Sequence, residues 1–158
     1  MSEFSDKVAE KLFSNCKPKK INTMLRPTQT YVTSPYGYRD LGNGKHFHNG
    51  VDLGRKDIFG KEHLEIIASF DGVIEKQWND SLNGNAMYLV GQKGWKCGFA
   101  HLKEYTCKEG DNVKAGDVIA IMGTTGKSGG VHLHFTLRKP GESSTVDPLH
   151  YIGCNFVG

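Results

Sequence analysis

Short segments rich in strand-forming residues recur along most of this chain, and turn-forming residues separate each segment from the next. The 158 residues include 20 glycines, whereas hydrophobic residues make up only 37% of the chain. This pattern favours many short strands joined by tight turns over a helical bundle, which needs longer uninterrupted amphipathic stretches. We therefore predict an all-β fold of antiparallel sheets. The expected strands cover residues 28–33, 66–70, 72–78, 86–90, 95–102, 118–122 and 131–137.

The length of the chain suits one domain with a hydrophobic core of its own. Residues 2–15 have the apolar spacing of a short amphipathic helix, and a polar stretch follows that contains Pro18 between lysines. We expect residues 1–26 to form this N-terminal helix and a connector. The compact domain is expected to span residues 27–158.

The charge pattern excludes several classes of partner. The formal net charge is +3, and no run of five or more like charges or nucleic-acid-binding motif is present, so we expect no nucleic-acid partner. No apolar stretch approaches the roughly 18 residues needed to cross a bilayer, which argues against membrane insertion. The first 20 residues also lack the basic start and apolar centre of a signal peptide. We expect a monomer.

The four cysteines, at positions 16, 97, 107 and 154, contain no CxxC pair and therefore lack zinc-finger spacing. Without a secretion signal, free thiols are the favoured interpretation. Cys97 and Cys107 flank one expected turn, and a disulfide between them under oxidising conditions is the alternative.

Two histidines in one expected strand, His132 and His134, are separated by a single residue. Side chains alternate between the faces of a strand, so both imidazoles should point the same way. The two could share a metal ion, or one could bind it while the other transfers protons. His46 and His48 have the same spacing, and one such pair is by itself weak evidence for a metal. No HExxH motif is present, which excludes the helical zinc-peptidase arrangement.

A second segment completes a candidate site, because His48 and Asp52 offer an imidazole and a carboxylate four residues apart. A catalytic zinc site takes three such ligands from the protein and leaves one position for water. His48, Asp52 and one member of the 132/134 pair would make this set, which leaves His101 and the other member for proton transfer. Spacing alone leaves open whether His46 or His48 binds, and which member of the pair does.

Several short motifs follow one another in a characteristic order. They are Tyr-Gly-Tyr-Arg at 36–39, His-Asn-Gly-Val-Asp-Leu at 48–53, Ala-His-Leu at 100–102, a glycine-rich run ending in His-Leu-His-Phe at 123–135, and Asp-Pro-Leu at 147–149. This ordered combination is similar to the lysostaphin-like (LytM-domain) zinc endopeptidases and covers roughly residues 33 to 152. The resemblance implies antiparallel sheets that form a substrate groove.

Carried over residue by residue, the resemblance implies that His48, Asp52 and His134 hold one Zn²⁺ ion per chain. His101 and His132 would form the catalytic pair. The implied reaction is peptide-bond hydrolysis, in which zinc activates water while the two histidines transfer protons and stabilise the oxyanion. By the same analogy, five residues are expected to line the groove: Tyr38, Arg39, Asn85, Thr124 and Ser128.

The resemblance also leaves three histidines outside the site, and the chain departs from the family pattern at residues 56–64. His46, His63 and His150 are expected to be surface or packing histidines. Residues 56–64 replace the short, proline-containing turn usual in the family with a charged insertion. One wall of the groove is therefore expected to differ from that of other members.

The function implied is a zinc endopeptidase that cleaves peptide crosslinks or stem peptides of peptidoglycan at the bacterial cell wall. A phage-encoded lytic enzyme or virion component would suit the single catalytic domain without a leader, as would an excised fragment. The alternative is a catalytically silent scaffold or activator of another hydrolase, a class that usually lacks one or more of the five site residues. This chain retains all five. A zinc-free β-sandwich module that binds sugar or lipid would require the order of the motifs to be accidental.

Overall fold

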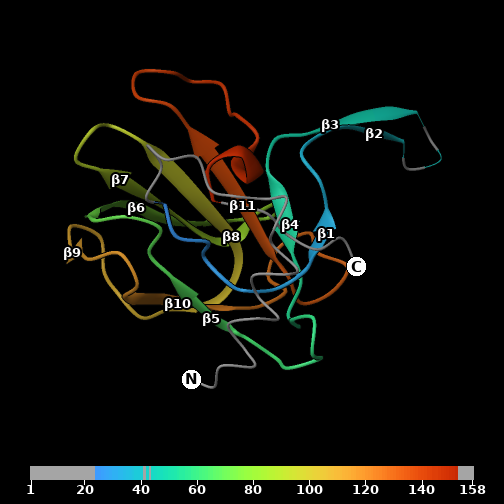
Figure 1. Cartoon of the computed structure of the whole chain (residues 1–158), viewed down its shortest axis with the longest axis horizontal. Coiled ribbons are helices and arrows are strands. Elements are labelled where there is room, and N and C mark those ends of the chain that lie inside the picture. The colour runs from blue at the N-terminus through green and yellow to red at the C-terminus, as the bar shows by residue number, and fades with distance from the viewer. Residues whose placement is uncertain (1–23, 41, 43, 153–158) are drawn as a thin grey trace, which may run out of the picture.

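The computed structural model describes residues 24–40, 42 and 44–152, and the regular secondary structure of this part of the chain is almost wholly β-strand (Figure 1). The expected N-terminal helix and most of the connector lie outside the described residues. A 3₁₀ helix, η1 (Pro148–His150), follows the last strand. The strands are β1 (Val32–Ser34), β2 (Gly37–Asp40), β3 (Lys45–His48), β4 (Val51–Leu53), β5 (Glu65–Ile67), β6 (Gly72–Asp80), β7 (Gly84–Gly91), β8 (Lys96–Tyr105), β9 (Asn112–Val113), β10 (Val118–Met122) and β11 (Leu133–Arg138).

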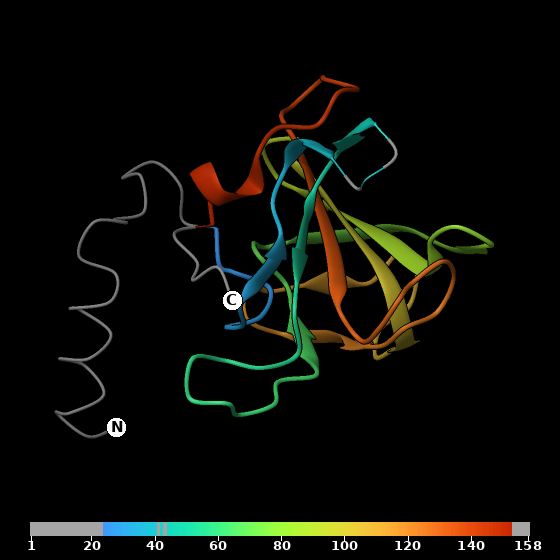
Figure 2. The same ribbon diagram turned by 90° about the vertical axis from the view of Figure 1, so that its right-hand side faces the viewer.

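Nine of these strands form one sheet in which every neighbouring pair is antiparallel. The main path runs β1-β4-β11-β8-β7-β6-β9, while β10 pairs with both β8 and β5. The long strand β8 changes partner along its length: Lys96–Ala100 pairs with β11, and the end beyond His101 pairs with β10. The sheet therefore divides at His101. Figure 2 shows the β5–β10 branch running across one side of the main path.

Alternation along the central strands separates the core from an open face. Phe99 of β8 and Phe135 of β11 are directly opposite each other, are both buried, and pack with ring centroids 5.3 Å apart. Their neighbours Gly98 and Thr136 are paired on the other face of the sheet. The core fills the space between the main path and the β5–β10 branch, because it unites Phe99 and Phe135 with Ile66 and Ile119.

The all-β, antiparallel prediction is confirmed, and the expected strand over residues 118–122 coincides with β10. Residues 27–29 form a bend, and β1 begins at Val32, later than expected. The strands β2, β3 and β4 were not predicted from the sequence. They are three or four residues long. The strands β2 and β3 carry mostly polar and aromatic residues and pair with each other as a hairpin, whereas β4 pairs with β11, which is distant in the sequence.

The hairpin formed by β2 and β3 projects from the body of the molecule (Figure 1). Tyr38 and Phe47 are directly opposite each other on one of its faces and are 77% and 50% exposed. Tyr36 packs against the same Phe47 ring at 5.3 Å. The paired residues Arg39 and His46 lie on the other face.

The two cysteines in the described part of the chain, Cys97 and Cys107, are free. The alternative of a disulfide between them is therefore not borne out in this structure. Cys97 is fully buried in the core, and burial raises the pKa of both thiols. Burial thus favours the protonated, less reactive form. No helix in the described residues has the length and apolar character needed to cross a membrane.

Candidate metal centre and histidine pair

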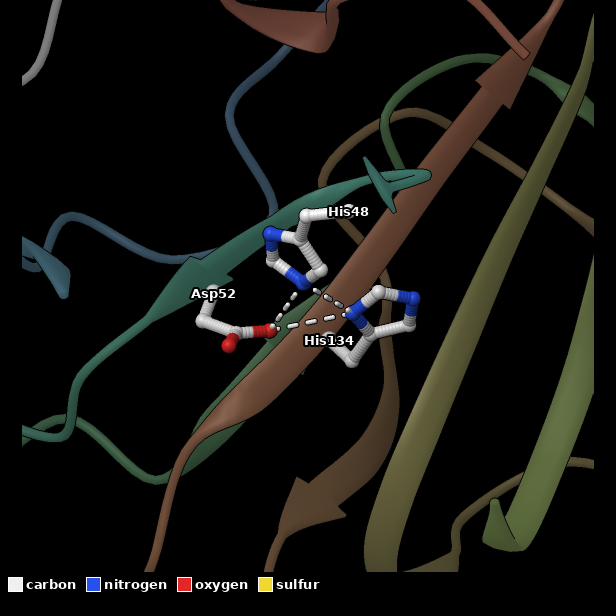
Figure 3. A group of neighbouring side chains, drawn as sticks. All are labelled: His48, Asp52 and His134. Carbon is white, nitrogen blue, oxygen red and sulfur yellow. Dashed lines mark hydrogen bonds and ion pairs between the residues drawn. The ribbon is translucent and has the colours of Figure 1, made fainter. Parts of the chain in front are cut away.

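His48, Asp52 and His134 converge from three different strands (Figure 3). The Oδ1 atom of Asp52 lies 3.2 Å from Nε2 of His48 and 3.0 Å from Nδ1 of His134. The two imidazole nitrogens are themselves 3.2 Å apart. Three potential metal-binding atoms therefore form one compact cluster, which we call the triad.

Sheet pairing and one close backbone approach bring the triad together. Asp52 in β4 and His134 in β11 are directly opposite each other in the ladder, so their side chains share a face. His48 ends β3, and Gly50 begins the return into β4. A Cβ atom on Gly50 would lie 2.3 Å from the carbonyl oxygen of Phe135, so only glycine allows this turn to pack against β11.

The outer nitrogens of the two triad histidines are held by oxygen acceptors. Nδ1 of His48 donates to the Pro35 carbonyl at 2.9 Å, and Nε2 of His134 donates to Oδ1 of Asn49 at 3.0 Å. These bonds assign the tautomers in which the inner nitrogens carry lone pairs. Three electron-pair donors then face one another, an arrangement that a shared proton or a cation can hold together.

The carboxylate of Asp52 is kept in its anionic form. Burial alone would raise its pKa, but when a proton is held on the inner nitrogen of His134 or His48 the hydrogen bond and positive charge outweigh burial, so the pKa lies well below its usual range. Nη1 of Arg39 lies 3.9 Å from the second oxygen, Oδ2. An ionised carboxylate is the form required of a metal ligand.

A β-bulge aims His101 at the same site. Asn85 and Met87 of β7 are two positions apart, whereas their partners Leu102 and Phe99 on β8 are three positions apart. In a regular strand the side chain of His101 would point toward the core, like that of Phe99. The extra residue reverses the alternation of β8 after Phe99 and turns His101 to the other face. His101 has φ +63°, the one non-glycine residue in the described chain with a positive φ.

His101 and His132 form a second group beside the triad, with ring centroids 4.8 Å apart. Their Nδ1 atoms donate to the carbonyls of Thr125 and Gly130, each at 2.8 Å. In both rings this leaves Nε2 with a lone pair, and Nε2 of His132 lies 3.7 Å from Oδ1 of Asp52. Burial lowers the pKa of His101, an effect that the Thr125 carbonyl partly offsets. The His101 ring is thereby kept neutral near physiological pH.

All five predicted residues of the site line one cavity of about 520 Å³. Of the predicted groove residues, Arg39 and Ser128 also line it. Tyr38, Asn85 and Thr124 do not belong to the lining formed by the described residues. Tyr38 lies on the outer face of the hairpin, and the Asn85 side chain donates instead to the Leu102 carbonyl at 3.0 Å. A second cavity of about 180 Å³ shares Asn49, Leu82, Asn83 and His134 with the first and extends it along the sheet.

The remaining histidines have separate surroundings. His46 lines the rim of the first cavity without joining the triad. His63 contacts Asp57 at 2.7 Å, and the exposed His150 lies 3.7 Å from Asp147. The charged insertion over residues 56–64 contributes nothing to the described lining of either cavity, so the expected difference in a groove wall is not seen there.

Sequence reasoning missed the residues that hold the histidines in place. Asn49, which fixes the His134 ring, follows directly after His48 and had a signal in its position within the motif. The carbonyls of Pro35, Thr125 and Gly130 had none, because any residue type supplies a backbone carbonyl. Asn83 likewise acts through its backbone, accepting from the amide of His101 at 2.7 Å.

Comparison with known proteins gives consistent matches. The sequence profile of peptidase family M23 matches residues 46–148. The chain is 34% identical over 122 residues to the DD-carboxypeptidase/endopeptidase Mpg of Neisseria meningitidis, covering 76% of this chain and 26% of Mpg. It is 33% identical over 133 residues to the murein hydrolase activator NlpD of Escherichia coli, covering 84% of this chain and 32% of NlpD. It thus spans about a quarter to a third of these relatives.

A solved structure has the same fold. The antimicrobial peptidase lysostaphin from Staphylococcus simulans superposes with a TM-score of 0.68 at 27% identity, covering 83% of this chain and 53% of that one.

Proposed function

Because the chain belongs to peptidase family M23, we propose that it is a zinc-dependent endopeptidase that hydrolyses peptide crosslinks or stem peptides of bacterial peptidoglycan. The observation that carries this proposal is the meeting of the triad and the His101–His132 pair in one cavity. Metal-assisted hydrolysis requires a metal site and a nearby base, and here a metal-binding cluster lies beside two imidazoles with free lone pairs.

The triad fits zinc in its donor chemistry and its spacing. Zinc takes imidazole nitrogen and carboxylate oxygen, and catalytic sites use three protein ligands. Neighbouring ligand atoms at about 2.0–2.1 Å from a tetrahedral ion lie about 3.3 Å apart. The three atom pairs of the triad, at 3.0–3.2 Å, are close to this value. His48, Asp52 and His134 would therefore hold the ion.

Bound zinc would act as a Lewis acid that polarises the scissile carbonyl and makes water more acidic. The protein's own contribution is the pair of imidazoles beside it. A neutral imidazole with a free Nε2 atom takes a proton from water and, once charged, returns it to the leaving amine. The second imidazole, when it carries a proton on Nε2 as well, donates a hydrogen bond from that atom to the oxygen on which negative charge develops. The carbonyls of Thr125 and Gly130 keep both rings oriented for these steps.

The names of the relatives support the substrate class and the place of action. Mpg is a carboxypeptidase and endopeptidase, and NlpD activates murein hydrolases. The second cavity gives an extended peptide room to continue along the sheet beyond the triad. We accordingly expect this chain to act on peptidoglycan peptides at the cell wall.

The likeness to NlpD supports a second candidate function, a silent domain that activates another hydrolase. The two candidates differ in catalysis. A peptidase binds about one zinc ion per chain and by itself releases new amino groups from purified peptidoglycan. With an activator, amino groups are released only when a separate hydrolase is present.

The test combines two measurements on the full chain. Zinc content is determined after dialysis, and the release of amino groups from purified sacculi is followed with and without a chelator. We expect bound zinc and chelator-sensitive release. Zinc-loaded protein without hydrolysis would favour the activator, and protein that fails to bind zinc would overturn the proposal.

A further inference from the structure

We propose that the groove contains a carboxylate-binding subsite at Arg138, so that the protein prefers peptides with a free carboxylate at a distance from the bond cleaved. The inference rests on the proposed function and deepens it, because it names the substrate class that the groove selects. No part of the hydrolytic reaction itself is assigned to Arg138.

The subsite lies on the same face of the same strand as the triad. His134, Thr136 and Arg138 alternate along β11, so all three side chains point to the groove side of the sheet. All three line the second cavity, which continues from the first. Four residues of strand put Arg138 about 13 Å from His134. An extended peptide of about four residues spans this distance.

Three paired residues line the second cavity between His134 and Arg138. Gly98 lies between Thr136 of β11 and Tyr88 of β7 in the ladder. A Cβ atom at this position would lie 2.4 Å from Oγ1 of Thr136 and 3.0 Å from the Tyr88 ring. The side chains of Thr136 and Tyr88 therefore close over Gly98, and the three residues together form the floor of the second cavity between His134 and Arg138.

The charge of Arg138 is uncompensated within the described part of the chain. Its Nε atom donates to the Ser143 carbonyl at 2.9 Å, and its guanidinium lies 5.6 Å from the centre of the Tyr88 ring. Its Nη1 atom is enclosed and has no hydrogen-bond partner. By contrast, the charge of the neighbouring Lys96 is compensated by an ion pair with Glu75 at 2.8 Å. No carboxylate of the described residues forms an ion pair with Arg138.

These features select an anion with the shape of a carboxylate. A guanidinium presents its donors as a planar fork; with Nε bound to Ser143 and Nη1 enclosed, Nη2 is the donor left to meet a carboxylate, and a half-buried cation gains more from such a partner than an exposed one. The carbonyl of Ser143 and the face of Tyr88 fix the plane of the fork. A stem peptide offers free carboxylates to it, whereas a glycine bridge offers only neutral amides.

The experiment compares soluble crosslinked muropeptides with the same muropeptides after their carboxylates are converted to methylamides. Binding of both ligands to the metal-free full chain is measured by calorimetry, which avoids cleavage, and kcat and KM are measured on the zinc-loaded protein. The variants are Arg138→Gln, Arg138→Lys and, as a matched control, Arg55→Gln. Arg55 is an exposed arginine paired with Glu62, outside both cavities.

We expect the wild type and Arg55→Gln to bind the free carboxylate form about tenfold more tightly, the size of one charge-assisted hydrogen bond. Arg138→Gln should bind both forms equally, and Arg138→Lys should recover part of the preference. The change should appear in KM rather than in kcat. Equal binding of both forms by the wild type, or a preference retained by Arg138→Gln, would overturn the subsite. Failure of the proposed function would look different: turnover would be absent while the binding preference persisted.

Discussion

The triad and the His101–His132 pair share one cavity but are built in different ways. The triad rests on regular antiparallel pairing, with Asp52 and His134 directly opposite each other. The pair depends on irregular backbone: a bulge and a positive φ at His101, and a loop whose Thr125 and Gly130 carbonyls accept hydrogen bonds from the two rings. Metal binding and proton transfer should therefore respond to different substitutions.

The contrast is also one of rigidity. The strands of the triad pack directly over the core residues Val51 and Phe135, which are fully buried. The loop that orients the pair contains exposed residues on either side of Thr125. A regular ladder supplies a fixed ligand geometry, whereas a bulge and a loop can set the direction of a ring independently of the sheet. Each prediction below changes one of the two regions and measures the other.

The largest effect should come from removing a triad ligand. His48→Ala, Asp52→Ala and His134→Ala should each lose most of the bound zinc, because two ligands hold the ion far less tightly than three. Hydrolysis should fall below detection. Metal analysis after dialysis and amino-group release from sacculi measure the two effects. His63→Ala is the control, since its partner is Asp57. Full zinc occupancy in all three variants would contradict the assignment.

Substitution within the pair should separate binding from turnover. His101→Ala and His132→Ala should keep their zinc while kcat falls by about 10²–10⁴, the usual contribution of a general acid or base. The measurement is kcat at matched zinc content. Wild-type turnover in either variant would remove that histidine from the proposed proton-transfer pair.

A smaller effect is expected from the turn that supports the bulge. The carboxylate of Asp80 accepts from the amides of Leu82 and Asn83 at 2.9 and 2.6 Å, and the Asn83 carbonyl in turn accepts from the His101 amide. Asp80→Ala should lower kcat by about tenfold through misplacement of the His101 ring. Zinc content should not change. Asp80→Asn, which keeps one acceptor, should recover part of the rate, and equal loss of zinc and activity would argue for general unfolding.

The smallest effect should be a pH-dependent difference in stability. Hydrogen bonds from the backbone and then the side chain of Asn83, and from Trp78, lower the pKa of Asp80 to about 2. An unfolded aspartate has a pKa of about 3.9, so the stabilising contribution is complete above about pH 4 and is lost as the pH falls toward 2. Urea midpoints of the wild type and Asp80→Asn should therefore differ at neutral pH and converge near pH 2. A difference independent of pH would contradict this origin.

Much of the fold and of the candidate site could be predicted from the sequence. The turn-punctuated pattern predicted antiparallel β-structure, and the ordered motifs indicated both the family and the five residues that the structure gathers around one cavity. Local patterns of this kind survive because alternation and turn chemistry act over a few residues. The strands β2, β3 and β4 were not predicted, because each is only three or four residues long and β4 gains part of its pairing from β11, which is distant in the sequence.

The face on which His101 lies was decided by tertiary structure. By parity alone His101 belongs with Cys97 and Phe99, which are buried in the core, and only the bulge turns it to the groove. Of the four acceptors that orient the histidines, three are backbone carbonyls, and these could not be predicted from the sequence. Sequence thus determined which chemical groups the chain carries and the order in which they occur. The direction of each ring depends on register, backbone angles and long-range contacts, and these exist only once the sheet has formed.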